Sequence, residues 1–142
     1  MSRGSALAAG AAQALNVLGG PLQLCCSAPL TGYFRDGFCV TGPADTGRHT
    51  VCAIVTSEFL AFTASRGNDL ATPHPPSFPG LKPGDKWCLC AGRWLEAYQA
   101  GVAPKVVLSA TNAATLRTVP KEALLEHAVE EAAVGPAGGS GT

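Results

Sequence analysis

The pattern of apolar and polar positions separates a loop-rich first third from a region in which strands and helices alternate. From residue 50 to 55 the chain is nearly all apolar and β-branched at alternate places, which predicts a buried strand. Short apolar runs predict further strands at 86–91 and 106–108. From 16 to 47, glycine, proline, threonine and aspartate are frequent, which indicates ordered loops built from turns.

Helices are expected between and after these strands. The first is expected to start at Thr56 or Ser57, whose side chains suit a helix cap, and to end at Gly67. The second is expected at 93–100, where the apolar residues are spaced for one face. Pro120 suits the first turn of a last helix.

These elements predict an α/β or α+β fold, with a single compact domain and a loop-rich N-terminal third. Helices would pack on a small mixed sheet of about three strands. The chain has 142 residues, of which 46% are hydrophobic, enough for one core. We expect a flexible N-terminal segment at 1–14, a globular domain at 15–130 and a disordered Gly-rich tail at 131–142.

Charge and hydropathy exclude two classes of partner. Basic and acidic side chains balance at ten each, so the basic surplus needed to bind nucleic acid is absent from the sequence. No apolar run approaches the roughly 18 residues that cross a membrane, and the N-terminus lacks the pattern of a secretory signal. A soluble protein of a reducing compartment, cytoplasmic or plastid, is therefore expected, with a small molecule or a second copy of the chain as its partner.

Six cysteines are the most distinctive chemical feature of this chain. A reducing compartment and an adequate core both argue against disulfides, which leaves metal ligands, reactive thiols or buried packing residues. Cys88 and Cys90 would share one face of a strand, so both could line one site. The leading hypothesis is a Cys/His site that binds zinc or another transition metal, or that performs thiol chemistry. The candidate ligands are Cys39, His49, Cys52, Cys88 and Cys90, with Cys25 at the margin.

Two polar loops support an alternative, a metal-free enzyme acting on a small polar molecule. His49 would be the general base, oriented by Asp69 or Asp85, with Arg35 or Arg93 contacting an anion. The competing interpretation is structural, because aspartates in such loops commonly accept hydrogen bonds from backbone amides in tight turns. Whether the protein is an enzyme therefore stays open.

A third hypothesis is a protein-interaction module in which Trp87, Trp94 and the Pro-rich loop form a contact surface. The familiar sequence motifs for nucleotide, hydrolase or zinc-protease sites are absent from the sequence. None of the three hypotheses is therefore favoured by a known motif.

Three segments, in this order along the chain, have a distinctive sequence: Thr31-Gly32-Tyr33-Phe34-Arg35-Asp36-Gly37, Gly47-Arg48-His49-Thr50-Val51-Cys52-Ala53 and Trp87-Cys88-Leu89-Cys90-Ala91. Together they resemble the domain of unknown function family numbered 2237. The resemblance covers roughly residues 16–128 and implies a compact single domain. The family brings no activity, cofactor or catalytic residue that can be carried over, so the resemblance assigns no role to any side chain.

Overall fold

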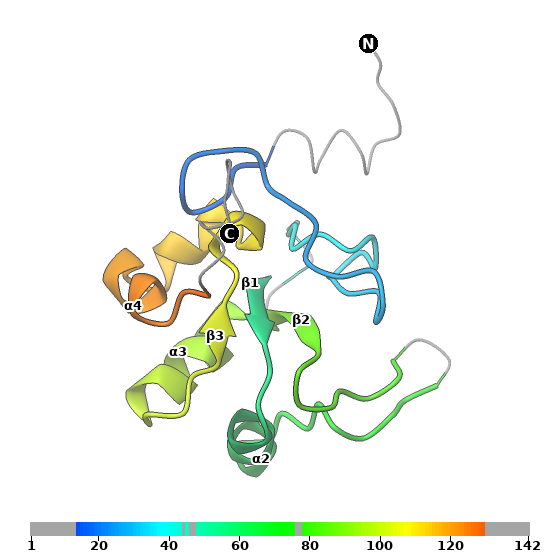
Figure 1. The fold of residues 1–142 in the computed structure, drawn as a ribbon. Coiled ribbons are helices and arrows are strands. Elements are labelled where there is room, and N and C mark those ends of the chain that lie inside the picture. The colour runs from blue at the N-terminus through cyan, green and yellow to red at the C-terminus, as the bar shows by residue number, and fades with distance from the viewer. Residues whose placement is uncertain (1–13, 44, 46–47, 76–77, 130–142) are drawn as a thin grey trace.

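A computed structural model describes residues 14–43, 45, 48–75 and 78–129 of the chain. Its strands form one sheet in the order β2-β1-β3 (Figure 1). The elements are β1 (His49–Ile54), α2 (Ser57–Ser65), β2 (Lys86–Cys90), α3 (Ala91–Gln99), β3 (Lys105–Val106), η1 (Leu108–Ala110), η2 (Ala113–Arg117) and α4 (Lys121–Glu126). The prediction of three strands with packed helices is thereby confirmed, in an α+β arrangement.

The three strands pair antiparallel, with β1 in the centre. The chain turns back after α2 so that β2 starts beside the end of β1, where Val55 donates a backbone hydrogen bond to Asp85. This return explains why the expected mixed sheet is antiparallel in its named strands. A parallel pairing does occur at the isolated bridge between Val106 and Ala128.

Local chemistry accounts for the predicted helix ends. The Thr56 side chain accepts a hydrogen bond from the backbone of Phe59 and caps α2, as the sequence indicates. Gly67 and Gly101 follow α2 and α3 with φ of +93° and +81°, a backbone conformation that glycine adopts without a steric cost.

One face of the sheet is covered by helices. Val51, Ala53 and Leu89 point to this face and pack into a continuous apolar core with residues of α2, α3 and α4. Trp94 of α3 is fully buried there, and its indole Nε1 donates a hydrogen bond to the carbonyl of Pro104 at 3.1 Å. This core contains most of the large apolar side chains.

The opposite face is covered by the loop-rich first third, the blue-to-cyan segment of Figure 1. Here the buried residues are small and sulfur-rich, and two disulfides join the layers. They link Cys25 to Cys52 and Cys39 to Cys88. The expectation of six reduced cysteines is therefore wrong for four of them, and Cys26 and Cys90 are free. The physical reason is that this third has little apolar material, so covalent links hold it to the sheet.

An irregularity in β1 decides which side chains share that face. The register with β2 shifts between His49 and Val51, so that His49 lies opposite Cys90 while Cys52 lies opposite Cys88. In a regular strand, residues an odd number apart point to opposite faces of the sheet. One extra residue in the strand shifts this alternation, so that such residues point to the same face. His49 and Cys52 therefore lie on the same side of the sheet, where a regular strand would place them on opposite sides.

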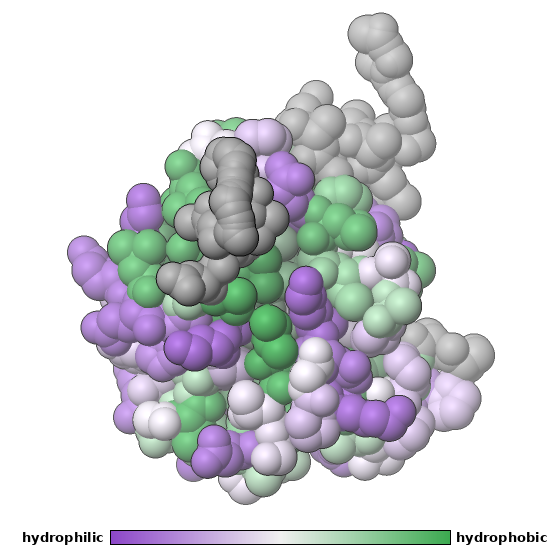
Figure 2. Space-filling model, viewed as in Figure 1, coloured by the Kyte–Doolittle hydropathy of each residue, from purple (hydrophilic) through white to green (hydrophobic). Residues whose placement is uncertain are grey.

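The surface mixes polar and apolar side chains over the face drawn in Figure 2. Among the described residues, no helix is long and apolar enough to cross a membrane. The expected N-terminal segment 1–14, apart from Ala14, and the expected tail at 131–142 lie outside the described residues.

Candidate catalytic triad

Three side chains at one end of β1 and β2 form a continuous hydrogen-bonded chain. His49 Nδ1 lies 2.6 Å from Asp45 Oδ1, and His49 Nε2 lies 3.3 Å from Cys90 Sγ. The Asp45 side chain has no exposed surface, whereas the His49 side chain is 35% exposed. Such an order, a buried carboxylate, an imidazole and a nucleophilic atom, is that of a catalytic triad.

Backbone geometry holds the carboxylate and the imidazole together. Asp45 Oδ2 accepts hydrogen bonds from the His49 backbone N–H at 2.9 Å and from the Thr41 hydroxyl at 3.0 Å. Between them, Arg48 has a φ of +54°, a conformation that non-glycine residues rarely adopt. This turn lets the Asp45 carboxylate contact both the backbone and the ring of His49.

Cys90 is fixed by the junction of a strand and a helix. It is the last residue of β2 and the N-cap of α3, and its side chain makes no capping hydrogen bond. The backbone N–H of the next residue, Ala91, donates to the Arg48 carbonyl at 3.0 Å and so joins α3 to the turn beside His49. The sulfur is consequently left to face the imidazole.

The electrostatics of the triad favour a protonated imidazole. The hydrogen bond with Cys90 is the main cause that raises the pKa of His49 to about 9, and Asp45 adds to it against the effect of burial. For Asp45, burial opposes ionisation, but the hydrogen bonds from the backbone and ring of His49 outweigh it and lower the pKa. At neutral pH the ring is therefore cationic, and both nitrogens donate, Nδ1 to Asp45 and Nε2 to the sulfur.

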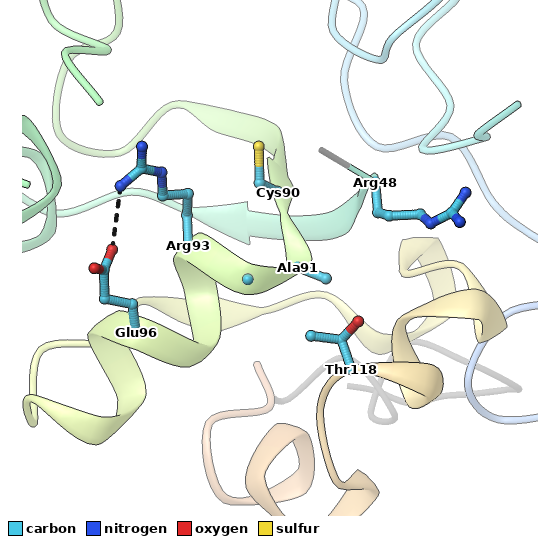
Figure 3. Close-up of a pocket in the computed structure, with 7 residues that line it drawn as sticks. Arg48, Cys90, Ala91, Arg93, Glu96 and Thr118 are labelled. Carbon is cyan, nitrogen blue, oxygen red and sulfur yellow. Dashed lines mark hydrogen bonds and ion pairs between the residues drawn. The ribbon is translucent and has the colours of Figure 1, made fainter. Parts of the chain in front are cut away.

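His49 and Cys90 each line a pocket. Cys90 lines an open pocket of about 600 Å³ together with Arg48, Gly92 and Arg93. Figure 3 shows Cys90 between the two arginines, with Arg93 paired to Glu96 at 3.3 Å. His49 lines a second pocket of about 240 Å³. A small molecule can thus approach the triad through either pocket.

The predicted enzyme residues are only partly brought together. Arg35 and Asp69 line the smaller pocket with His49. Asp69 accepts backbone hydrogen bonds from Ala71 and Thr72, and Asp85 accepts one from Lys82. Both carboxylates therefore serve turns, as the structural interpretation expects.

The two arginines named as anion contacts lie in different places. Arg35 lies over the Trp87 ring at 5.1 Å and donates to the carbonyl of Gly32. Arg93 lines the larger pocket beside Cys90, where it pairs with Glu96 and donates to the Arg66 carbonyl. Arg93 is thus the one that shares a pocket with Cys90.

The predicted metal ligands divide into two groups. Cys39, Cys52 and Cys88 join Cys25 in the buried disulfide cluster, whereas His49 and Cys90 contact each other. The sulfurs of Cys25, Cys39 and Cys88 lie within 4.8 Å of one another, a spacing that could hold a metal ion. Cys25, which the sequence puts at the margin of the ligand set, is thus part of the cluster.

Asp45 is the member of the candidate triad that the sequence does not single out. It is four residues before His49 in a loop, and the sequence offers Asp69 and Asp85 as partners with equal justification. The sequence signal for Asp45 is its position in the same polar segment as His49. That position indicates that the two residues lie close together, but it does not indicate how their side chains are oriented.

The tryptophans do not provide a contact surface. Trp87 is 5% exposed and Trp94 is fully buried, Trp87 against Phe78 and Trp94 against Tyr98. The interaction-module hypothesis thus loses the two aromatic residues on which it depended.

A known protein family matches most of the chain. The family model described as "Uncharacterized protein conserved in bacteria (DUF2237)" matches residues 15–128. No curated protein matches the chain.

Proposed function

The chain belongs to the DUF2237 family, and from this premise we propose that it is a thiol-dependent enzyme acting on an activated carbonyl group. Cys90 is the nucleophile, His49 its proton-transfer partner and Asp45 the residue that orients His49. The observation that supports this most directly is the hydrogen-bonded chain from Asp45 through His49 to Cys90.

The reaction follows from the contacts of the triad. The Cys90 sulfur attacks the carbonyl carbon, and the bond to the leaving group breaks as His49 Nε2 transfers its proton to that group. Water then hydrolyses the thioester, and its proton passes to His49, which restores Cys90 and the protonated ring to their starting state. An acid is released in the second step, and no oxidant or reductant is consumed.

The first turn of α3 suits the negative charge that develops on the carbonyl oxygen. Backbone N–H groups in the first turn of a helix have no acceptor within the helix. Gly92 lines the pocket beside Cys90, and the space where a Cβ would stand has no atom within 4 Å. A substrate can therefore approach the Gly92 backbone without meeting a side chain.

Asp45 replaces Asp69 and Asp85 in this proposal, while His49 keeps the role that the sequence suggests. The carboxylate fixes the ring so that Nε2 faces the sulfur, as in other nucleophile–histidine–carboxylate sites. Transition-metal binding at His49 and Cys90 is the less favoured candidate, since Cys39, Cys52 and Cys88 are taken up by disulfides.

Thiol alkylation tests this proposal with an internal control. In the protein with both disulfides intact, Cys26 and Cys90 are the free cysteines, and both are half-buried. We expect iodoacetamide at pH 7 to modify Cys90 at least ~10-fold faster than Cys26, because the Cys90 sulfur lies 3.3 Å from the protonated His49 ring and an adjacent cation activates a cysteine toward alkylation. Peptide mass spectrometry over time measures both rates in one sample.

The triad variants separate activation from simple exposure. His49→Gln and Asp45→Asn should slow alkylation of Cys90 and leave that of Cys26 unchanged, with circular dichroism confirming the fold. An aryl ester should release about one equivalent of phenol per chain in a burst that Cys90→Ser lacks. Equal rates at Cys26 and Cys90, together with no burst, would overturn the proposal.

A further inference from the structure

Four cysteines outside the triad meet in the interior from four separate segments. Cys25 and Cys39 belong to loops of the first third, Cys52 to β1 and Cys88 to β2. Their residues are between 0% and 4% exposed. The proposed thiol chemistry at Cys90 uses none of these four cysteines. Two disulfides can also form far apart in a protein, so the disulfides alone do not explain why the Cys25–Cys52 and Cys39–Cys88 pairs lie in one cluster.

Three of the four sulfurs are already spaced as a tetrahedral metal site needs. Those of Cys25, Cys39 and Cys88 lie within 4.8 Å of one another, whereas the Cys52 sulfur is bonded to Cys25 but stands outside this group and would have to turn toward it. Four thiolates around zinc at a Zn–S distance of about 2.3 Å lie ~3.8 Å apart. If the two S–S bonds were broken, each pair would need to separate by ~2 Å, a distance that small side-chain rotations supply.

The backbone around these cysteines is held by bonds other than the disulfides. Cys52 N–H donates to the Thr111 hydroxyl at 3.1 Å, and Cys88 N–H donates to the Thr31 hydroxyl at 2.8 Å. Asn112 Nδ2 donates to the Cys39 carbonyl at 3.0 Å. In the sheet register, Cys52 and Cys88 face each other directly. Reduction would thus leave the four side chains near their present positions.

We propose that the reduced protein binds one Zn²⁺ in a closed site made of Cys25, Cys39, Cys52 and Cys88. A dithiol reductant converts each disulfide to two thiols and is itself oxidised to a cyclic disulfide. The four thiols then release four protons and bind the ion as thiolates. Oxidation of the thiolates re-forms the two disulfides and expels the zinc, so the two states exclude each other.

Either state links the first third to the sheet. Disulfides join Cys25 and Cys39 to the two strands covalently, and zinc would join the same four positions through its coordination bonds. The site is closed, with four protein ligands and no position for water, which is the arrangement of structural zinc.

Metal titration of the whole chain tests the site. Protein is reduced with dithiothreitol under nitrogen, freed of reductant, and titrated with Zn²⁺ against a chromophoric chelator, and with Co²⁺ by absorbance. We expect one equivalent of each metal, with the thiolate-to-cobalt bands of a tetrahedral sulfur site. Diamide, which takes two electrons per thiol pair, should then release one equivalent of zinc and re-form two disulfides.

Single variants identify the ligands. Cys39→Ser and Cys52→Ser should each abolish stoichiometric binding, whereas Cys26→Ser and Cys90→Ser should bind as the parent does. Cys90→Ser also separates this site from the proposed enzyme, because it removes the burst with an aryl ester and retains zinc. Loss of zinc in Cys90→Ser or His49→Gln would overturn the four-cysteine assignment and leave the alkylation result standing.

Folding of the reduced chain is followed in the same samples. If reduction unfolds part of the protein, zinc should restore the circular dichroism of the oxidised form, because metal binding is coupled to folding. Reduced protein that stays folded and binds no zinc, or that zinc fails to refold, would overturn the proposal.

Discussion

The two faces of the sheet are stabilised by different physics. On the helix-covered face, a continuous apolar core contains Phe59, Leu89, Trp94 and Leu124, each fully or almost fully buried. On the loop-covered face, the buried cluster consists of four cysteines with Ala110 and partly buried Val107. The same sheet therefore uses the hydrophobic effect on one side and covalent links on the other.

This difference explains where the chemistry lies. Buried polar side chains gather on the loop-covered face, where Thr31, Thr111 and Asn112 donate to or accept from the backbone. A layer held by disulfides and specific hydrogen bonds can accommodate a buried carboxylate such as Asp45, which a packed apolar core would not. The triad lies at the edge of this layer.

Truncation of Trp94 gives the largest expected effect on the helix-covered face. Trp94→Ala should lower the free energy of unfolding by about 3–5 kcal/mol, because it leaves a cavity and removes the hydrogen bond to Pro104. Denaturant unfolding measures the change. Leu125→Ala, at a side chain that is 49% exposed, should cost about 0.5 kcal/mol or less and serves as the control.

Removal of the Cys39–Cys88 disulfide comes next and acts on the other face. The link joins residues 49 apart, so the double variant Cys39→Ala, Cys88→Ala should lose about 2–4 kcal/mol in oxidising, zinc-free buffer. Hydrogen exchange should show loss of protection in the first third before α2 and α3. Equal loss in both layers would mean that the two faces unfold as one unit.

The smallest expected effect on stability is its dependence on pH, which the His49 side chain of the triad causes. The pKa of His49 is about 9 in the folded chain and 6.5 for an ordinary histidine. Its protonation therefore stabilises the fold fully below pH 6.5, and this contribution is lost as the pH rises through 9. We expect Tm to fall over this window in the parent chain and to fall less in His49→Gln. Parallel curves for the two proteins would contradict the assigned interaction.

The helix-covered face is the part that the sequence predicts well. Apolar periodicity locates β1, α2, β2 and α3 to within one or two residues at most ends, and Thr56 and Gly67 delimit α2 as expected. The cause is local, since propensity, capping and apolar spacing all point to the same elements there.

The site needs information that local pattern does not contain. The contact between His49 and Cys90 depends on the register shift in β1, and the contact between His49 and Asp45 depends on the positive φ of Arg48. Pairing of the cysteines depends on how the loops of the first third cross the sheet. Each is a tertiary property, so the sequence supplies the residue types and the structure supplies the partners.

The two disulfides overlap along the chain, because Cys39 lies between Cys25 and Cys52, and Cys52 lies between Cys39 and Cys88. A single peptide-bond cleavage anywhere from Cys25 to Cys88 therefore leaves the two fragments tied together. The segment that carries Asp45 and His49 runs between the inner cysteines and is anchored at both ends. A nick in it would pass unnoticed on a non-reducing gel, and the cut ends would stay within reach of each other.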